Sequence, residues 1–117
     1  RNSRSTPRRQ VLLSMAHDLS RVLADLGLYR RNRQVLVSEL TGAGFSVPIP
    51  DGAFYVFPRS PIADEDFVLE LLDHRVIAVP GSGFGCPGYF RLAFCVASEV
   101  VDGALPVFRE LGDKHFH

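Results

Sequence analysis

Apolar residues recur at steps of three and four along the first third of the chain, and this spacing predicts one long amphipathic helix over 12–43. Only Arg33 lies out of the pattern, and the stripe keeps its phase on both sides of Gly27, so we expect the helix to continue through that glycine. Gly42 and Gly44 supply its end. The predicted stripe comprises Leu12, Met15, Leu19, Val22, Leu26, Tyr29, Leu36, Leu40 and Ala43.

The middle of the chain predicts two short extended segments and a second helix. The extended segments cover 45–49 and 53–57, and the residues Pro50-Asp51-Gly52 between them suit a tight turn. Two prolines, Pro48 and Pro50, argue that the first segment is an edge strand or no strand. Residues 64–75 predict a helix that starts with three acidic side chains. Its predicted buried stripe is Phe67, Val68, Leu71 and Leu72.

Two further strands and a closing helix complete the pattern. Residues 76–79 are all apolar and predict a strand buried on both faces. The run 89–96 alternates, which assigns Phe90, Leu92, Phe94 and Val96 to the core face and Tyr89, Arg91, Ala93 and Cys95 to the other. Ser98 begins a helix through Leu111, with a kink expected near Pro106. This order predicts an α+β fold, a three- or four-stranded sheet with helices packed on one face and preceded by the long N-terminal helix.

Arg91 is the clearest chemical signal, because it is a charge inside an apolar strand. An unpaired guanidinium would be costly to bury, so the strand must place it against a partner. A salt bridge to Asp51 or Glu99 would satisfy it. A small carboxylate bound from outside would also satisfy it, because the guanidinium fork matches a carboxylate. The residues alone leave both interpretations open.

A glycine-rich loop, VPGSGFGCPG, precedes the Arg91 strand. Gly83, Gly85 and Gly88 match the G-x-G-x-x-G spacing of dinucleotide-binding loops, but a proline and a strand follow them, so no helix N-terminus is available for a pyrophosphate. We therefore expect a conformational role. Glycines permit positive φ and close backbone approach, which would let the chain turn sharply, with Phe84 fixing the loop.

Composition narrows the classes of partner. The 13 basic and 13 acidic residues balance, and no apolar run approaches the ~18 residues of a membrane span, so we expect a cytoplasmic protein with no nucleic-acid or membrane partner.

Cys86 and Cys95 lack metal or redox spacing, and we interpret His115 and His117 as solvated, so no metal site is expected. The length suits one domain, between a mobile linker at 1–11 and a polar tail at 114–117.

Three ordered motifs resemble a known family. Gly52-Ala53-Phe54-Tyr55, the segment 76–85 and Arg91-Leu92-Ala93-Phe94 resemble the small C-terminal domain of the class I/II aminotransferases, which are fold-type I pyridoxal-phosphate enzymes of the aspartate aminotransferase family. The likeness covers about 12–111, and we assign this domain to 12–113. It implies that Arg91 binds the α-carboxylate of an amino-acid substrate by a two-pronged ion pair. It also implies that Gly52, Phe54 and Tyr55 lie along the substrate cleft.

The resemblance further implies ping-pong transamination between an amino acid and a 2-keto acid, in a homodimer with pyridoxal phosphate as cofactor. In that family the Schiff-base lysine and most cofactor ligands belong to a large domain. The one lysine here, Lys114, lies in the tail and matches no family lysine motif. We therefore expect no catalytic or cofactor-binding residue in this chain, which would be a fragment inactive without its large domain. The alternative is a free-standing module that binds a small carboxylate for regulation or assembly.

Overall fold

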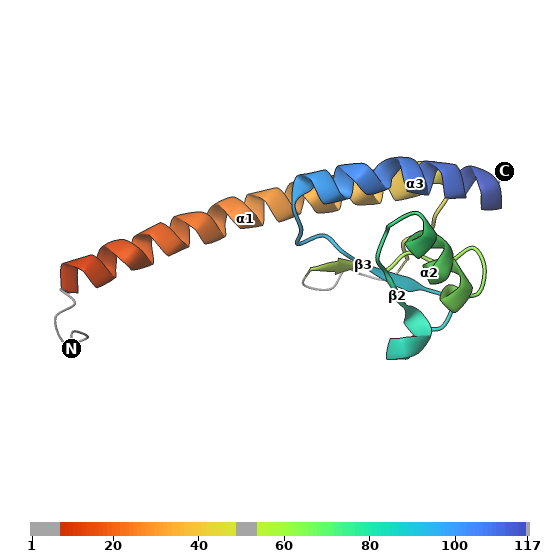
Figure 1. The fold of residues 1–117 in the computed structure, drawn as a ribbon, viewed down its shortest axis with the longest axis horizontal. Helices are drawn as coiled ribbons and strands as arrows, with labels where there is room; N and C mark the ends of the chain where they lie inside the picture. The colour runs from red at the N-terminus through yellow and green to blue at the C-terminus, as the bar shows by residue number, and fades with distance from the viewer. Residues whose placement is uncertain (1–7, 49–53, 117) are drawn as a thin grey trace.

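The computed structural model describes the backbone of residues 8–48 and 54–116 and the side chains of 19–21, 23–48 and 54–116. It confirms an α+β fold with a three-stranded antiparallel sheet in the order β1-β3-β2 (Figure 1). The elements in chain order are α1 (Arg8–Ala43), β1 (Tyr55–Val56), α2 (Asp64–Asp73), β2 (Val79–Pro80), the 3-10 turn η2 (Gly81–Phe84), β3 (Phe90–Ala93) and α3 (Ser98–Phe116).

Helix α1 is continuous through Gly27, as its apolar stripe predicts. Its C-terminal half lies alongside α3 and runs in the same direction, whereas its N-terminal half extends away from the rest of the fold (Figure 1). The stripe is consequently buried at Leu36 and Leu40 but exposed at Leu19 and Leu26. Periodicity predicts which side of a helix is apolar, but only neighbouring elements decide how much of that side is covered.

Both long helices reach further than predicted. Residues 8–11, which we expected to belong to a mobile linker, are helical in α1, and 114–116, expected to be a polar tail, form the last turn of α3. The end of α3 is tied to α2, because Glu70 pairs with Lys114 and with His115. Phe116 adds an apolar contact to this last turn, because its ring centroid lies 5.0 Å from that of Phe45. Pro106 lies inside α3, which runs unbroken past it.

A cluster of aromatic rings joins the helices to one face of the sheet. Phe45 lies at its centre, with ring centroids 5.8 Å from Phe67 of α2, 6.2 Å from Phe90 of β3 and 5.9 Å from Phe108 of α3. All four side chains are buried. The α-helices therefore share one core on the Phe90 face of β3. The buried residues of this core are Leu36, Leu40, Ala43, Phe45, Val56, Phe67, Leu71, Val76, Phe90, Leu92, Phe94, Val101, Phe108 and Leu111.

One strand alternative is settled and one strand prediction is wrong. The segment around Phe45 forms no strand over its described residues, the second of the two alternatives that its prolines left open, because Phe45 enters the core and β1 pairs with β3 instead. The strand predicted at 76–79 pairs only at Val79 and Pro80, and Ile77 is 81% exposed rather than buried. β2 is an edge of the sheet, so part of this apolar segment has no neighbour to cover it. Leu72, placed in the buried stripe of α2, is likewise 54% exposed.

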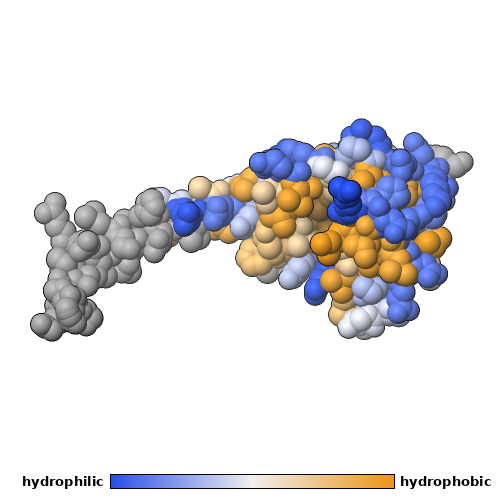
Figure 2. All heavy atoms as spheres, viewed as in Figure 1, coloured by the Kyte–Doolittle hydropathy of each residue, from blue (hydrophilic) through white to orange (hydrophobic). Residues whose placement is uncertain are grey.

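Charged and apolar side chains occupy different parts of the surface. Figure 2 shows hydrophilic side chains gathered over α3 and hydrophobic ones gathered below it. Exposed apolar side chains of the described fold include Leu69, Leu72, Ile77 and Val100. None of the described helices combines the length and apolarity needed to cross a membrane.

A histidine links α2 to α3 and makes the stability of this contact depend on pH. His74 contacts the backbone carbonyl of Glu70 through Nδ1 at 3.0 Å and the carboxylate of Glu110 through Nε2 at 2.8 Å. These acceptors, the Glu70 carbonyl first, raise the pKa of His74 above its ordinary value of 6.5. The folded protein therefore binds this proton more tightly than the unfolded chain does.

We expect the free energy of unfolding to fall as pH rises above the ordinary histidine pKa of 6.5, because this contribution is complete below the unfolded pKa and is lost through the raised folded pKa. The contact is partly exposed, so the change should be about 1 kcal/mol or less. Urea unfolding at a series of pH values measures it. His74→Gln should flatten the profile in this range, and an unchanged slope in that variant would assign the pH dependence to other groups.

Candidate functional site

Arg91 lies on β3, the central strand, and faces away from the helices. Its neighbours Phe90 and Leu92 are buried in the core at 0% and 4% exposure, whereas Arg91 is half-buried and Ala93 exposed. The predicted division of this strand into a core face and an open face is therefore confirmed. β1 and β2 pair with β3 on either side and fix its orientation.

Two aromatic rings contact the Arg91 guanidinium. Its Cζ atom lies 4.3 Å from the ring centroid of Tyr55 in β1 and 5.5 Å from that of Phe84 in η2. A guanidinium attracts aromatic faces through its planar surface. Its N–H donors lie in that plane, at the edge, and are not used by this kind of contact. The rings thus restrict the plane of the guanidinium without satisfying its hydrogen-bonding capacity.

No described carboxylate forms an ion pair or hydrogen bond with Arg91. Of the two internal partners considered from the sequence, Glu99 accepts a hydrogen bond from the Ser98 hydroxyl at 2.9 Å instead. Asp51 lies outside the described residues. Within the described fold, Arg91 is therefore a half-buried cation held by rings and not by an acid.

The other predicted site residues divide into three cases. Tyr55 lies against Arg91, and its register opposite Ala93 explains why. Phe54 is 42% exposed and packs edge-on against Tyr29 of α1, with centroids 6.2 Å apart, so it contacts the helix and has no recorded contact with Arg91. Gly52 lies outside the described residues.

The glycine loop turns for the reasons expected, although not at every glycine. Gly85 and Gly88 have positive φ values of 83° and 90°. At Gly81 a Cβ atom would lie 1.9 Å from the carbonyl oxygen of Cys86, so only glycine fits there. Gly83 has open space and no positive φ, and its glycine is not required. Phe84 packs against Phe57 with centroids 5.8 Å apart, which confirms its role in fixing the loop.

Two polar residues that secure this region were missed from the sequence. Asn32 of α1 is fully buried, and its amide donates hydrogen bonds to the carbonyls of Phe94 at 3.0 Å and Val96 at 2.8 Å, just beyond β3. The signal was an amide three residues after Tyr29, on the apolar side of the helix.

Asp64, the first residue of α2, is also buried at 7% exposure, and its Oδ2 accepts the Ser82 N–H at 2.7 Å. That N–H lowers the pKa of Asp64, against the opposing effect of burial.

A second arginine lies near the same strand. Arg59 donates to the Tyr89 hydroxyl at 2.8 Å, and its Cζ lies 5.2 Å from the centroid of that ring. Its backbone forms an antiparallel bridge with Tyr89, but its side chain is exposed. Arg59 and Arg91 thus share aromatic contacts and differ in burial.

The one lysine belongs to the helical layer. Lys114 on α3 pairs with Glu70 of α2, and His115 contacts the same carboxylate at 2.6 Å. Burial alone would raise the pKa of Glu70, but these two hydrogen bonds outweigh burial and lower it. The prediction that His115 is solvated is wrong, because its side chain is only 13% exposed. His117 lies outside the described residues, among which no group of three potential metal ligands occurs.

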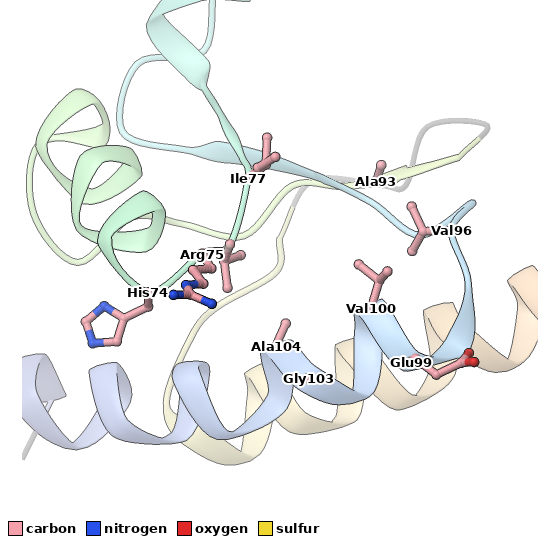
Figure 3. Close-up of a pocket in the computed structure, with 10 residues that line it drawn as sticks. His74, Arg75, Ile77, Ala93, Val96, Glu99, Val100, Gly103 and Ala104 are labelled. Atoms are coloured by element: carbon pink, nitrogen blue, oxygen red, sulfur yellow. The ribbon is translucent and has the colours of Figure 1, made fainter.

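An apolar groove of about 670 Å³ lies between the α2–β2 connection and α3. Figure 3 shows Ile77, Ala93 and Val96 on one side of it and Val100 and Ala104 on the other. Arg91 is not among its lining residues. Ala93, two residues after Arg91 on the same face of β3, does line it, so the groove adjoins this face without including Arg91.

Comparison with known proteins gives a consistent result. A family model described as aminotransferase class I and II matches residues 2–107. The LL-diaminopimelate aminotransferase of Nitratidesulfovibrio vulgaris (strain DSM 19637 / Miyazaki F) is 34% identical over 85 residues, which are 68% of this chain and 22% of that protein. The chain thus spans about a fifth of that relative's length.

Solved structures of this family have the same fold over most of the chain. An aromatic aminotransferase from Pyrococcus horikoshii OT3 superimposes with a TM-score of 0.74 at 30% identity, over 84% of this chain and 28% of that one. An aspartate aminotransferase from Thermus thermophilus with maleate superimposes with a TM-score of 0.70 at 30% identity, over 82% and 26%. The chain therefore belongs to the class I and II aminotransferase family.

Proposed function

We propose that this chain is the substrate-binding small domain of a pyridoxal-phosphate-dependent aminotransferase, and that Arg91 binds the α-carboxylate shared by amino-acid and 2-keto-acid substrates. One observation carries the proposal. Arg91 is a half-buried guanidinium positioned by two aromatic rings, with no described acid against it. Such a group is prepared for an anion that arrives from outside.

The geometry suits a carboxylate in particular. A carboxylate can accept two parallel N–H bonds from the edge of a guanidinium, and this arrangement is stronger and more directional than a single contact. Tyr55 and Phe84 contact the guanidinium through their rings and have no carboxylate that would compete for its edge. Positioning is then supplied by β3 and by both rings before the substrate binds, which lowers the entropic cost of binding.

The described residues do not fit the cofactor itself. In this family pyridoxal phosphate supplies the electron sink that makes the Cα proton removable. Lys114 is the only lysine, and it is paired with Glu70 in the helical layer, whereas Arg91 faces away from that layer. We propose that a large domain of the same protein supplies the lysine and the cofactor, within a homodimer, and that this chain alone does not transaminate.

The alternative, a free-standing carboxylate-binding module, would use the same arginine. The family membership favours the aminotransferase interpretation. The aspartate aminotransferase from Thermus thermophilus has been solved with maleate, a small dicarboxylate, and its match covers 82% of the present chain. Maleate is therefore a suitable probe for the proposed site.

Titration of the chain with maleate, followed by nuclear magnetic resonance, tests the proposal. We expect saturable shifts of the Arg91 Nε–H resonance and of the Tyr55 and Phe84 ring resonances, because these groups surround the proposed site. The affinity should be weak, with a Kd on the order of 1 mM, because a single charge pair contributes only a few kcal/mol. Dimethyl maleate, which lacks the charge, is the matched control ligand.

Arg91→Gln should abolish these shifts, since glutamine is neutral and cannot form the two-pronged pair. Arg59→Gln serves as the control variant, because Arg59 is a nearby arginine that stacks on another tyrosine. Maleate shifts that persist in Arg91→Gln, or the complete lack of saturable shifts in the unmodified chain, would overturn the assignment of Arg91.

A further inference from the structure

We propose that Asp64 is a positioning residue for Arg91, because it fixes the η2 turn at the place where Phe84 supports the guanidinium. The inference rests on the proposed function of Arg91 as a carboxylate-binding group. It concerns a residue on a different element, at the start of α2, which does not contact Arg91 itself.

The first step of the argument is the burial of Asp64. Its neighbours in the first turn of α2, Glu65 and Asp66, are exposed, whereas Asp64 is 7% exposed. A buried carboxylate needs hydrogen-bond donors to offset its lost hydration. The donor here is the backbone N–H of Ser82 at 2.7 Å, which belongs to η2. Asp64 therefore joins the helical layer to the turn that follows β2.

The second step is the rigidity of the turn. The Cys86 N–H donates to the Gly81 carbonyl at 2.8 Å, and the Gly81 N–H donates to the Tyr89 carbonyl at 2.7 Å. Ser82 and Phe84 lie in the same four-residue 3-10 turn, which these bonds close. A displacement of Ser82 is consequently passed to Phe84.

The third step is the contact between Phe84 and the guanidinium. The Phe84 centroid lies 5.5 Å from Arg91 Cζ, and the same ring packs against Phe57. Tyr55 supplies the other ring from β1. If η2 moves, Arg91 keeps one ring and loses the other, and its plane is less restricted. A misplacement of about 1 Å at a binding group can cost up to about 100-fold in the step it supports.

Maleate affinity in the 117-residue chain, measured by the same magnetic resonance titration, tests the inference. We expect Asp64→Ala to raise the Kd for maleate by about tenfold, within the range that displacement of a binding group can produce. Asp64→Asn, which keeps an acceptor oxygen at the same position, should recover most of the affinity. Asp66→Ala is the matched control, because it removes an acid from the same helical turn but leaves the Ser82 contact intact.

Each outcome separates this inference from the proposed function. Arg91→Gln losing maleate binding while Asp64→Ala retains full affinity would overturn the role of Asp64 and leave that of Arg91 standing. Unchanged binding in Arg91→Gln would overturn the proposed function first. A merely structural role of Asp64 would lower the melting temperature without changing the Kd of the folded variant, and this outcome also overturns the inference.

A second variant keeps the test decisive if Asp64→Ala does not fold. Asp64→Ser keeps a small polar residue at the first position of α2, but its side chain is too short to maintain the contact with Ser82. We expect this variant to fold by circular dichroism, to bind maleate about tenfold more weakly and to lose the Phe84 ring shift. Full affinity in folded Asp64→Ser would contradict the proposal.

Discussion

Arg91→Lys is expected to reduce kcat/KM for amino-acid substrates by about 30-fold or more in the complete aminotransferase that the proposed function assigns to this domain. The reduction corresponds to about 2 kcal/mol, the lower end of the cost of disrupting a desolvated charge pair. Lysine keeps the positive charge, but it lacks the planar fork that would bind both carboxylate oxygens and that contacts the rings of Tyr55 and Phe84. Steady-state kinetics with an amino acid and with an amine of similar size measures the effect.

The loss should be selective. Amines without a carboxylate make no use of Arg91, so their kcat/KM should not change. Arg59→Lys is the matched control, since Arg59 also stacks on a tyrosine but is exposed, and it should leave both substrates unaffected. An equal loss for amines and amino acids in Arg91→Lys would show that the arginine has a general structural role and does not recognise the carboxylate.

Gly81→Ala is expected to lower the free energy of unfolding by about 3 kcal/mol, at the upper end of what overpacking costs. A Cβ atom at this position would lie 1.9 Å from the Cys86 carbonyl oxygen and 2.7 Å from that of Tyr89. Both obstacles are backbone atoms, and both carbonyls accept hydrogen bonds that close the loop. The loop must therefore open to admit even a methyl group. Urea unfolding monitored by circular dichroism measures the change.

Gly83→Ala is the control within the same turn. Nothing lies within 4 Å of a Cβ atom at Gly83, and its φ is not positive. Alanine should therefore be neutral there, or stabilising by up to about 1 kcal/mol through the reduced entropy of the unfolded chain. Equal destabilisation by both alanines would show that the loop requires flexibility at its glycines and not close approach at Gly81.

The alternation of β3 and the periodicity of α1 could be predicted because each is a local property. Residues two apart on a strand share a face whatever lies above it, and thus Phe90 and Leu92 were correctly assigned to the core and Arg91 to the open face. The glycine loop was predictable for a similar reason, since Gly85 and Gly88 take backbone conformations that other residues avoid.

Predictions failed where burial depended on distant neighbours. Ile77 belongs to an all-apolar segment that is typical of a core strand. The segment leads into the edge strand of the sheet, however, and Ile77 is exposed. Asn32 is polar and would be expected at the surface. It is buried because its amide donates hydrogen bonds to two carbonyls beyond β3, which are 62 and 64 residues away in sequence. No local pattern encodes such pairings.

By itself the sequence determined the order of the α-helices, the face to which each side chain of β3 points, and the motifs that resemble an aminotransferase domain. Only the tertiary structure decided what surrounds Arg91, because its partners Tyr55 and Phe84 come from β1 and η2. It also revealed that Asp64 reaches the turn carrying Phe84. Side-chain direction follows from local backbone geometry, whereas a contact between distant segments exists only once the whole chain has packed.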